Sequence, residues 1–591
     1  MTNSHQGRNH MRLGIRKLSL PTLAVLLGSV ALLASAGCGS STPTGPGDLA
    51  GSQVYNRTFF LAGSADIGTF DPTLAQSTAE STVINFTFGG LLTLDKNLAV
   101  EKWDAKDYSV SADGLTYTFH LRDNVKFSNG KAVTASDYAY AINRAANPCV
   151  ASPLSSYVYS IKDATTFANE TCSNGTISAA TGQTSPVITT LIGDSLQAVD
   201  NKTLKITLQA PGAYFLEEMT YPVYYAIDQA VVGLDSTGEK WTDTLTQGAT
   251  GQGGDGPYYV SFWDHATAIK LKPNPNWWGY VRNTHPYLQE LDFTFFSNSD
   301  TAYTAYQAGQ FDYAQVTPAS AVAAARSDAD FHEITQLTEQ YLAFSIKTPP
   351  FDNKDARAAF CLAINRDQLV SSILKNTRKA IWSIVPQGMP GYVANATGPD
   401  GVTATAGDQA KAKTHWAAYV ASLGGKPVPA ISVLYRTGDS TSKAFYEAIA
   451  AAETQVLGVT VATKGEDFNT FINDETVGNF QTGRFAWAAD YPDPQDWTTL
   501  LFTTDSTNLG GQASAPGADA QMHQADAEAD PNKRVQEYIT VEKELLANAT
   551  VCPLYQYLYQ YKVRNYVHGY LEDAQTFVPL DSIVSMYITK H

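Results

Sequence analysis

Three aspartates spaced three residues apart, Asp490, Asp493 and Asp496, offer the clearest candidate chemistry in this chain of 591 residues. Pairs of acidic residues cleave glycosides, one carboxyl acting as general acid and the other as base or nucleophile. Two prolines interrupt this stretch and forbid a regular helix or central strand, so the spacing does not say how far apart the carboxylates lie. Hydrolysis is therefore one hypothesis for the segment.

Asp490 taken alone suggests binding. It directly follows an apolar run, residues 485–489, which is long enough for a buried strand and too short for a stable helix. A carboxylate buried at the end of such a strand needs a positive partner or several hydrogen-bond donors. If the protein supplies no cation, the ammonium group of a ligand can. The alternative is that Asp490 only caps the following turn through its own backbone.

Other motifs of enzymes and cofactor sites are incomplete. His332 and Glu333 begin the zinc-protease motif, but Gln336 stands where its second histidine is required. The sequence GQGGDG at 251–256 matches a dinucleotide fingerprint formally, yet it leads into an expected strand instead of a helix N-terminus. No Cys/His spacing is typical of a metal site. We therefore expect no enzyme activity, cofactor or metal, with a secreted hydrolase as the remote alternative.

The first 37 residues have the organisation of a targeting segment. A basic region precedes an apolar stretch at 18–33, and the sequence ASAGC that ends at Cys38 resembles the lipobox of bacterial lipoproteins. We expect residues 1–37 to be a signal peptide, Cys38 to be lipidated and residues 38–51 to be a flexible tether. A transmembrane anchor is the alternative, but the apolar stretch is short for the ~20 residues of a spanning helix.

The acidic charge limits the possible partners. Removing residues 1–37 deletes four basic residues and no acidic ones, which takes the formal net charge from −17 to −21. Such a surface is unsuited to nucleic acid or to anionic lipid headgroups. We expect the protein to be held at the outer face of the bacterial cell membrane by its lipid chain alone.

The remaining cysteines agree with export. An even count, Cys149, Cys172, Cys361 and Cys552, suggests two disulfides in an oxidising compartment. Three pairings are possible, and sequence proximity favours Cys149 with Cys172, which leaves Cys361 with Cys552. Free buried thiols are the alternative.

The length and the alternation of elements predict an α/β protein of two or three lobes. A strand is expected at 115–121, and a helix begins where Asp530 can cap it and Pro531 can take the first position. A second strand, at 553–561, places tyrosines at every second position on one face. The aromatic content of 11% favours an aromatic-lined binding surface.

Many short stretches together resemble one family. They occur in one order along the chain, at 70–72, 90–92, 133–137, 256–258, 274–279 (NPNWWG), 305–312, 349–352, 363–367, 488–494 (AADYPDP), 553–555 and 586–591. Both the stretches and their order are similar to those of the peptide- and oligopeptide-binding components of bacterial ABC importers, the family 5 extracytoplasmic solute-binding proteins.

The resemblance implies a two-lobed α/β fold of the class II periplasmic-binding-protein type, with an extra inserted lobe and a ligand cleft between lobes that close by a hinge. Mapped onto this sequence, lobe I comprises 52–88, 191–338 and 557–591. The inserted lobe II comprises 89–190, and lobe III comprises 339–556.

The resemblance also implies a site. In the oligopeptide binders the carboxylate matching Asp490 accepts the α-ammonium of the peptide, and strand edges beside the cleft pair with the peptide backbone. The candidate edges and walls are Gln76, Ser77, Thr78, Ala486, Trp487, Ala488, Tyr555 and Tyr557. Core packing is the alternative role for Trp487. Arg484 occupies one position that grips the C-terminal carboxylate in some members, whereas Glu475 and Thr441 replace other basic residues.

These implications lead to one expected function. We expect a monomeric receptor that binds peptides, either dipeptides or oligopeptides, and delivers them to an ABC permease. The alternative is a receptor of the same fold for another solute, namely a nickel or haem complex or an oligosaccharide. A sugar carries no ammonium, so Asp490 argues against it.

Overall fold

The structure is a computed structural model. It describes residues 49–60, 66–75, 77–235, 238–241, 254–279, 286–317, 319–437, 440–504, 506, 514 and 517–591. The expected signal peptide, Cys38 and Gln76 lie outside the described residues, so what we expect of them remains a prediction. None of the described helices is long and apolar enough to cross a membrane.

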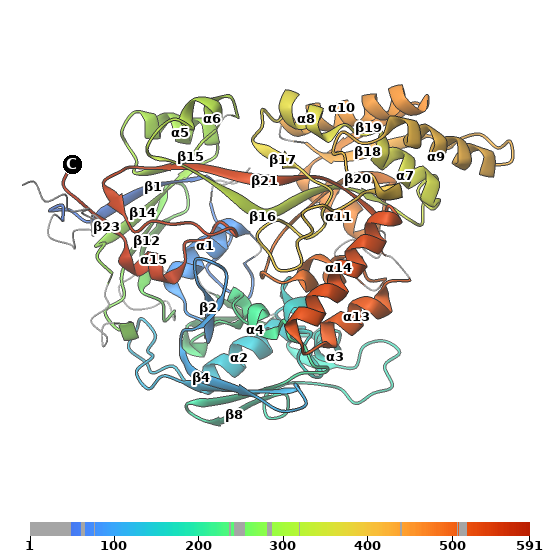
Figure 1. The fold of residues 1–591 in the computed structure, drawn as a ribbon. Helices are drawn as coiled ribbons and strands as arrows, with labels where there is room; N and C mark the ends of the chain where they lie inside the picture. The colour runs from blue at the N-terminus through green and yellow to red at the C-terminus, as the bar shows by residue number, and fades with distance from the viewer. Residues whose placement is uncertain are drawn as a thin grey trace, which may run out of the picture. The chain divides into compact units, whose positions relative to one another are not determined.

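A mixed sheet of eleven strands runs through the described chain (Figure 1). In spatial order its strands are β12 (Tyr258–Asp264), β13 (Ala268–Pro273), β14 (Glu290–Phe296), β1 (Val54–Phe60), β15 (Tyr313–Gln315), β21 (Val551–Val563), β16 (Phe331–Phe344), β20 (Thr482–Ala488), β18 (Ile431–Arg436) and β19 (Val461–Glu466), with β17 (Arg378–Ala380) paired to β21. Strand β1 is parallel to β14, and β18 is parallel to both β19 and β20. The expected strand at 553–561 is confirmed as part of β21.

Two long antiparallel strands connect the two ends of this sheet. Strand β16 has 14 residues and β21 has 13, and they pair from Phe331 opposite Lys562 to Ala343 opposite Val551. Their register shifts between Thr335 and Glu339. The predicted boundaries at 338/339 and 556/557 both fall inside these paired strands, so the chain passes between the predicted main lobes within the sheet.

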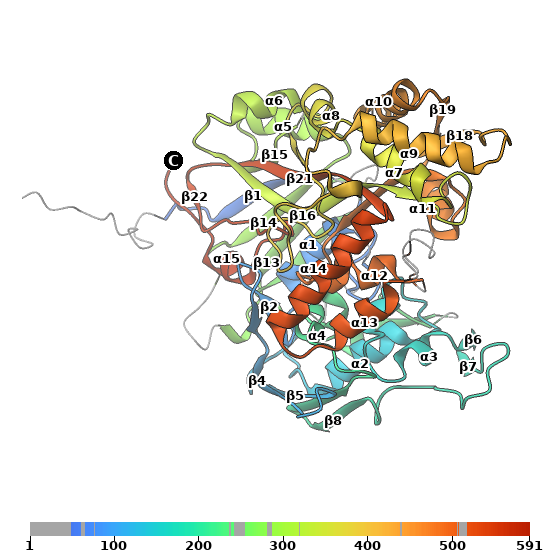
Figure 2. The ribbon, with the colours of Figure 1, turned by 45° about the vertical axis from the view of Figure 1, so that its right-hand side comes forward.

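Helices cover both faces of the sheet. Figure 1 shows α5 and α6 on one side of β1 and β15 and α1 on the other, and Figure 2 shows α13 and α14 on the side of the main sheet that faces α2. The helices are α1 (Thr78–Thr87), α2 (Ala135–Ala146), α3 (Ala164–Ala168), α4 (Phe215–Glu218), α5 (Ser299–Gln307), α6 (Ala319–Ala325), α7 (Lys354–Ala363), α8 (Arg366–Ser372), α9 (Gln409–Ser422), α10 (Ser440–Leu457), α11 (Phe468–Val477), α12 (Thr499–Phe502), α13 (Asp519–Ala527), α14 (Pro531–Ala547) and α15 (Leu580–Ser585). Helix α14 begins as expected, with the Asp530 side chain accepting the Lys533 N–H at 2.8 Å.

A second sheet of four strands has the order β4 (Ala105–Val110), β5 (Thr116–Leu121), β9 (Thr203–Thr207) and β8 (Leu196–Asp200). The strand expected at 115–121 is β5, whose residues alternate between buried and partly buried. Strand β9 pairs with β5 along its length, so this sheet joins residues on both sides of the boundary predicted at 190/191. The remaining short strands are β2 (Leu92–Leu94), β3 (Val100–Lys102), β6 (Thr171–Ser173), β7 (Thr176–Ser178), β10 (Val232–Asp235), β11 (Gly238–Trp241), β22 (Val567–His568) and β23 (Tyr587–Ile588).

Two disulfides join Cys149 to Cys172 and Cys361 to Cys552, which is the pairing that sequence proximity favoured. The second bond ties α7 to β21. The buried guanidinium of Arg366 donates from Nη2 to the Cys552 sulfur at 2.9 Å and from Nε to the Pro553 carbonyl at 2.6 Å. These contacts hold α8 against the same strand.

Helix α10 carries a buried acid that its surroundings do not compensate. Glu453 is completely buried, and neither of its carboxylate oxygens has a hydrogen-bond partner. Burial alone raises its pKa well above the usual value, because the charged form loses its hydration. The native state therefore holds a proton here that the unfolded chain releases above about pH 4.5.

Glu453→Gln is expected to raise the free energy of unfolding at pH 7 to 8 by ~1 kcal/mol or more. The pKa of Glu453 is higher in the folded protein than in the unfolded chain. The wild type therefore loses up to ~1.4 kcal/mol of stability for each pH unit above the pKa of the unfolded chain. The glutamine variant does not titrate and has no such loss. Urea unfolding at pH 5 and pH 8 measures this. A gain that is equal at both pH values would contradict an electrostatic origin.

Candidate ligand-binding site

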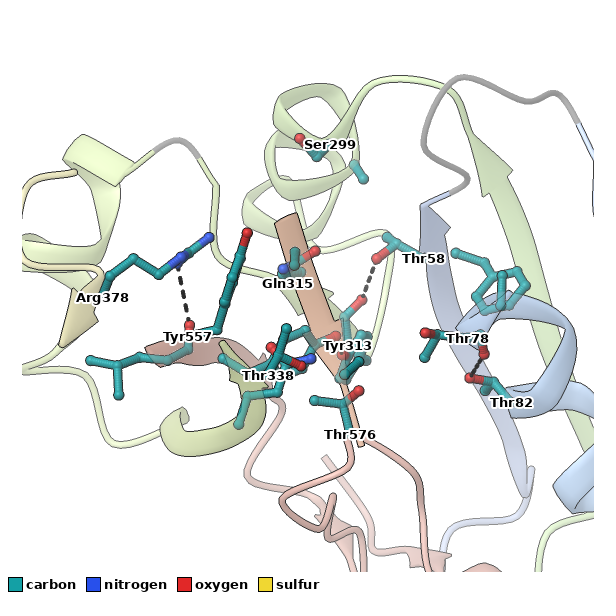
Figure 3. Close-up of a pocket in the computed structure, with 18 of the residues that line it drawn as sticks. Thr58, Thr78, Thr82, Ser299, Tyr313, Gln315, Thr338, Arg378, Tyr557 and Thr576 are labelled. Carbon is teal, nitrogen blue, oxygen red and sulfur yellow. Dashed lines mark hydrogen bonds between the residues drawn. The ribbon is translucent and has the colours of Figure 1, made fainter. Parts of the chain in front are cut away.

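A cavity of about 450 Å³ lies beside the end of β20 (Figure 3). Strands β1, β15, β16, β17, β20 and β21 and helices α1 and α5 contribute to its wall. Six residues named from the sequence line it, namely Thr78, Arg484, Ala486, Trp487, Ala488 and Tyr557. Segments more than 400 residues apart in sequence therefore meet at one site, which no local pattern encodes.

Strand β20 presents an open edge beside this cavity. One edge pairs with β16 from Thr482 to Ala488, whereas β18 covers the other edge only at Thr482 and Gly483. Beyond Gly483, no strand among the described residues pairs with that second edge. Because unpaired N–H and C=O groups on a strand edge accept an extended chain, residues 484–488 can add a ligand as a further strand.

The second predicted edge, at residues 76–78, is wrong for the two residues that the structure describes. Ser77 is the N-cap of α1 and Thr78 is its first residue. The Ser77 N–H donates to Glu80 Oε2 at 2.9 Å, and its carbonyl accepts from Ser81 N at 3.0 Å. Because its backbone N–H and C=O are both hydrogen-bonded within the helix cap, Ser77 has no free backbone group for strand pairing with a ligand. Thr78 still lines the cavity, through the first turn of the helix.

Asp490 lies just beyond β20 and lines a separate, smaller cavity of about 50 Å³, not the large one. Tyr157 Oη donates to its Oδ2, and Tyr221 forms a second hydrogen bond to the carboxylate. The two tyrosine rings stack with centroids 4.7 Å apart. No lysine or arginine among the described residues forms an ion pair with Asp490. The carboxylate is thus held by donors and left without a countercharge.

Burial raises the pKa of Asp490 to about 7, although the hydrogen bonds from Tyr157 and Tyr221 favour the ionised form. Asp573 lines the same small cavity, and burial raises its pKa to about 7 as well. No basic side chain contributes to the described wall of this cavity. Its chemistry therefore suits a cation.

The other two aspartates of the motif have structural partners. Asp496 is completely buried and accepts the Asp490 N–H at 3.1 Å and Trp487 Nε1 at 3.3 Å. Asp493 accepts two hydrogen bonds from Arg534, one of them at 2.8 Å from Nη1. Neither carboxylate is open to a substrate in the manner that a paired-acid hydrolase needs. Trp487 lines the cavity and also packs against Phe485, and its contact with a ligand stays a prediction.

Basic and aromatic residues line a side pocket of about 200 Å³. Arg378, Arg484 and Tyr557 line both this side pocket and the large cavity, whereas Tyr555 lines the side pocket alone. The Arg378 guanidinium lies 4.3 Å from the centre of the Tyr557 ring. Burial opposes ionisation of Tyr557, but Arg484 and Arg378 outweigh it and lower the pKa of this phenol. These two arginines therefore stabilise the ionised form of the Tyr557 hydroxyl.

Sequence reasoning missed Tyr157, Tyr221 and Arg378. Tyr157 meets Asp490 across 333 residues of sequence, and β17, which carries Arg378, is a strand of only three residues. None of these three residues belongs to a motif or pattern that could be recognised in the local sequence. Among the described residues, no group of three or more His, Cys, Asp or Glu side chains could hold a metal ion.

Comparisons with known proteins show which family this chain is similar to. The family model "Bacterial extracellular solute-binding proteins, family 5 Middle" matches residues 99–508. The dipeptide-binding protein DppE of Bacillus subtilis is 27% identical over 521 residues, which cover 86% of this chain and 89% of that protein. The periplasmic oligopeptide-binding protein OppA of Escherichia coli is 27% identical over 586 residues, covering 96% and 97%.

A solved structure extends the match to the fold. The murein tripeptide binding protein MppA of Escherichia coli superposes with a TM-score of 0.73 at 26% identity, covering 92% of this chain and all of that one. The fold and the family model thus define an extracytoplasmic solute-binding protein of the two-lobed α/β class. This chain belongs to the bacterial extracellular solute-binding proteins of family 5.

Asp490→Asn is expected to stabilise the ligand-free protein at pH 8 by on the order of 1 kcal/mol. The native pKa of about 7 exceeds the ordinary 3.8, so the wild type loses stability as pH rises through this range, and asparagine does not. Calorimetric melting at pH 5 and pH 8 measures the difference. The control is Asp107→Asn, because the side chain of Asp107 is 70% exposed. A variant less stable than wild type at pH 8 would show that the carboxylate is already compensated.

Proposed function

We propose that this protein is a receptor that binds peptides outside the cytoplasm and delivers them to an ABC permease. The observation that carries the proposal is the carboxylate of Asp490 at the end of an open strand edge. Two tyrosines hold it, and none of the described residues gives it a countercharge. A peptide supplies both missing partners, namely an ammonium group and a row of backbone N–H and C=O groups. The names of the dipeptide- and oligopeptide-binding relatives support the same ligand class.

In the proposed complex the peptide α-ammonium lies against Asp490 and the peptide backbone extends along residues 484–488. Asp490 lies six positions after Arg484, which corresponds to ~20 Å of extended chain at ~3.3 Å per residue. Main-chain pairing explains how one receptor accepts many sequences, since every peptide offers the same groups. Trp487, Tyr555 and Tyr557 form walls for the side chains.

The alternative ligands lack specific support in the structure. An oligosaccharide brings no cation for Asp490. For a nickel complex, the described residues provide no cluster of metal-binding side chains, although a chelated metal needs few protein ligands. Catalysis is not part of the proposal, because the other two aspartates of the motif have structural roles: Asp496 is buried behind the Asp490 backbone, and Asp493 is paired with Arg534.

The proposal also covers the cellular location of the protein and the division of its chain into lobes. A lipid on Cys38 would hold a monomeric receptor at the outer face of the membrane. Lobes I and III would close on the peptide by bending where β16 and β21 change register, near the predicted boundary at 338/339. The predicted lobe II contributes Tyr157 to the site, so closure and ligand contact are coupled there.

Asp490→Ala is expected to weaken peptide binding by tens to thousands of fold. Removing one partner of a buried charge pair costs ~2–5 kcal/mol, because the ammonium is left desolvated and unpaired. Calorimetry with a mixture of di- to pentapeptides measures the loss. N-acetylated peptides lack the α-ammonium charge that pairs with Asp490, and they should bind the wild type as weakly as free peptides bind the variant. Unchanged affinity in the variant would rule out this role for Asp490.

Peptide affinity is expected to follow a bell-shaped pH profile with its maximum between about pH 7 and 8. Below the pKa of about 7, protonation of Asp490 removes the negative partner, and affinity falls by up to ~10-fold per pH unit. Above ~8 the free peptide amine loses its own charge. Calorimetry between pH 5 and pH 9 tests this, and an affinity that is constant from pH 5.5 to 8 would contradict it.

A further inference from the structure

The small cavity beside Asp490 contains a second carboxylate, which the α-ammonium of a peptide leaves unused. Asp573 forms part of the cavity wall and is 6% exposed. Its Oδ1 accepts the Gln575 N–H at 2.9 Å and the Phe577 N–H at 3.1 Å. Among the described residues, none donates to its Oδ2 and no lysine or arginine pairs with it, whereas the nearby acid Glu572 disfavours its charge. One carboxylate oxygen is therefore available to a ligand.

Gln575 holds the two acidic segments in a fixed relation. Its side-chain Nε2 donates to the carbonyls of Ala489 at 3.0 Å and Asp490 at 3.2 Å. Its backbone N–H is one of the two donors to Asp573. The Asp490 backbone and the Asp573 carboxylate are thus linked through a single residue, while the two carboxylates accept from different donors. A ligand with two ammonium groups can give one to each acid.

The rest of the cavity wall suits a long side chain with an apolar stem. Its volume of about 50 Å³ corresponds to roughly three to five water-sized groups, at ~10–15 Å³ for each. The lysine side chain is such a row, because it consists of four methylenes and an ammonium. Lysine packs its stem on carbon surface while its charged end meets a polar partner. Carbon surface comes from Leu94, Pro222, Phe577, Val578, Pro579 and Leu580.

We propose that the small cavity receives the basic side chain of the first peptide residue and pairs it with Asp573, so that the receptor prefers peptides that begin with lysine. This inference rests on the proposed peptide-binding function, which places the α-ammonium at Asp490. The first side chain leaves the peptide backbone next to that ammonium, and hence beside the small cavity. Later residues extend along 484–488 in the large cavity, whose described wall contains neither Asp490 nor Asp573.

The test compares pentapeptides of alanine whose first residue is lysine or norleucine, which has the same four-carbon stem without the ammonium. A second pair carries lysine or norleucine at position 3, where the side chain lies in the large cavity. Calorimetry on the full chain gives each dissociation constant. The peptide that begins with lysine should bind about 10- to 100-fold more tightly than its norleucine partner, because it gains a charged hydrogen bond. The pair at position 3 should show no such gain.

Two variants assign this preference to a residue. Asp573→Asn keeps an oxygen for the backbone donors and removes the charge, so it should reduce the ratio between lysine and norleucine peptides to about threefold or less. The norleucine peptide should bind this variant as it binds the wild type. The matched control is Asp581→Asn, which removes a charge from an exposed position on α15 outside the described cavity wall and should keep the wild-type ratio.

Three outcomes overturn the inference. The first is a ratio within about twofold for the N-terminal pair while the peptides still bind, which leaves the peptide-binding function intact. This comparison needs no variant, so it decides even where Asp573→Asn does not fold. The second is an undiminished ratio in Asp573→Asn, or an equal gain from lysine at position 3, which would assign the preference to the net negative charge of the protein. The third is no binding by any peptide, which would overturn the proposed function as well.

Discussion

The site depends on one electrostatic constraint, a carboxylate that is kept from bulk water and has no cation in the described part of the chain. Isolating such a group is unfavourable, and the protein limits this cost with the hydroxyls of Tyr157 and Tyr221. It does not remove the cost, because Asp496, a second acid, lies directly behind the Asp490 backbone. A positively charged group of a ligand can pair with this carboxylate.

The backbone around this carboxylate is fixed from several parts of the chain. The Ala489 N–H donates to the Leu337 carbonyl at 2.8 Å, and Gln575 Nε2 donates to the Asp490 carbonyl at 3.2 Å. Leu337 lies within the register shift of β16. The irregular point of β16 is therefore hydrogen-bonded directly to the residue before Asp490.

Local signals in the sequence were sufficient for local structure. The strand ending near Asp490, the start of α14 at Asp530 and the alternating tyrosines of β21 all follow from patterns within about ten residues, and the structure contains them. Contacts across hundreds of residues have no such signal, so Tyr157 and Arg378 were missed. Ser77 shows the opposite error, because its capping box with Glu80 was readable locally and was overlooked in favour of a strand edge.

The two disulfides enclose stretches of chain of very different length. Cys149 and Cys172 are 23 residues apart, so an oxidant can join them soon after both emerge. Cys361 must wait for its partner 191 residues later, on β21. During that interval Cys361 is a free thiol while the first disulfide is already formed, and thiolates attack disulfides. Efficient maturation of this receptor therefore favours a compartment that supplies a disulfide isomerase as well as an oxidant.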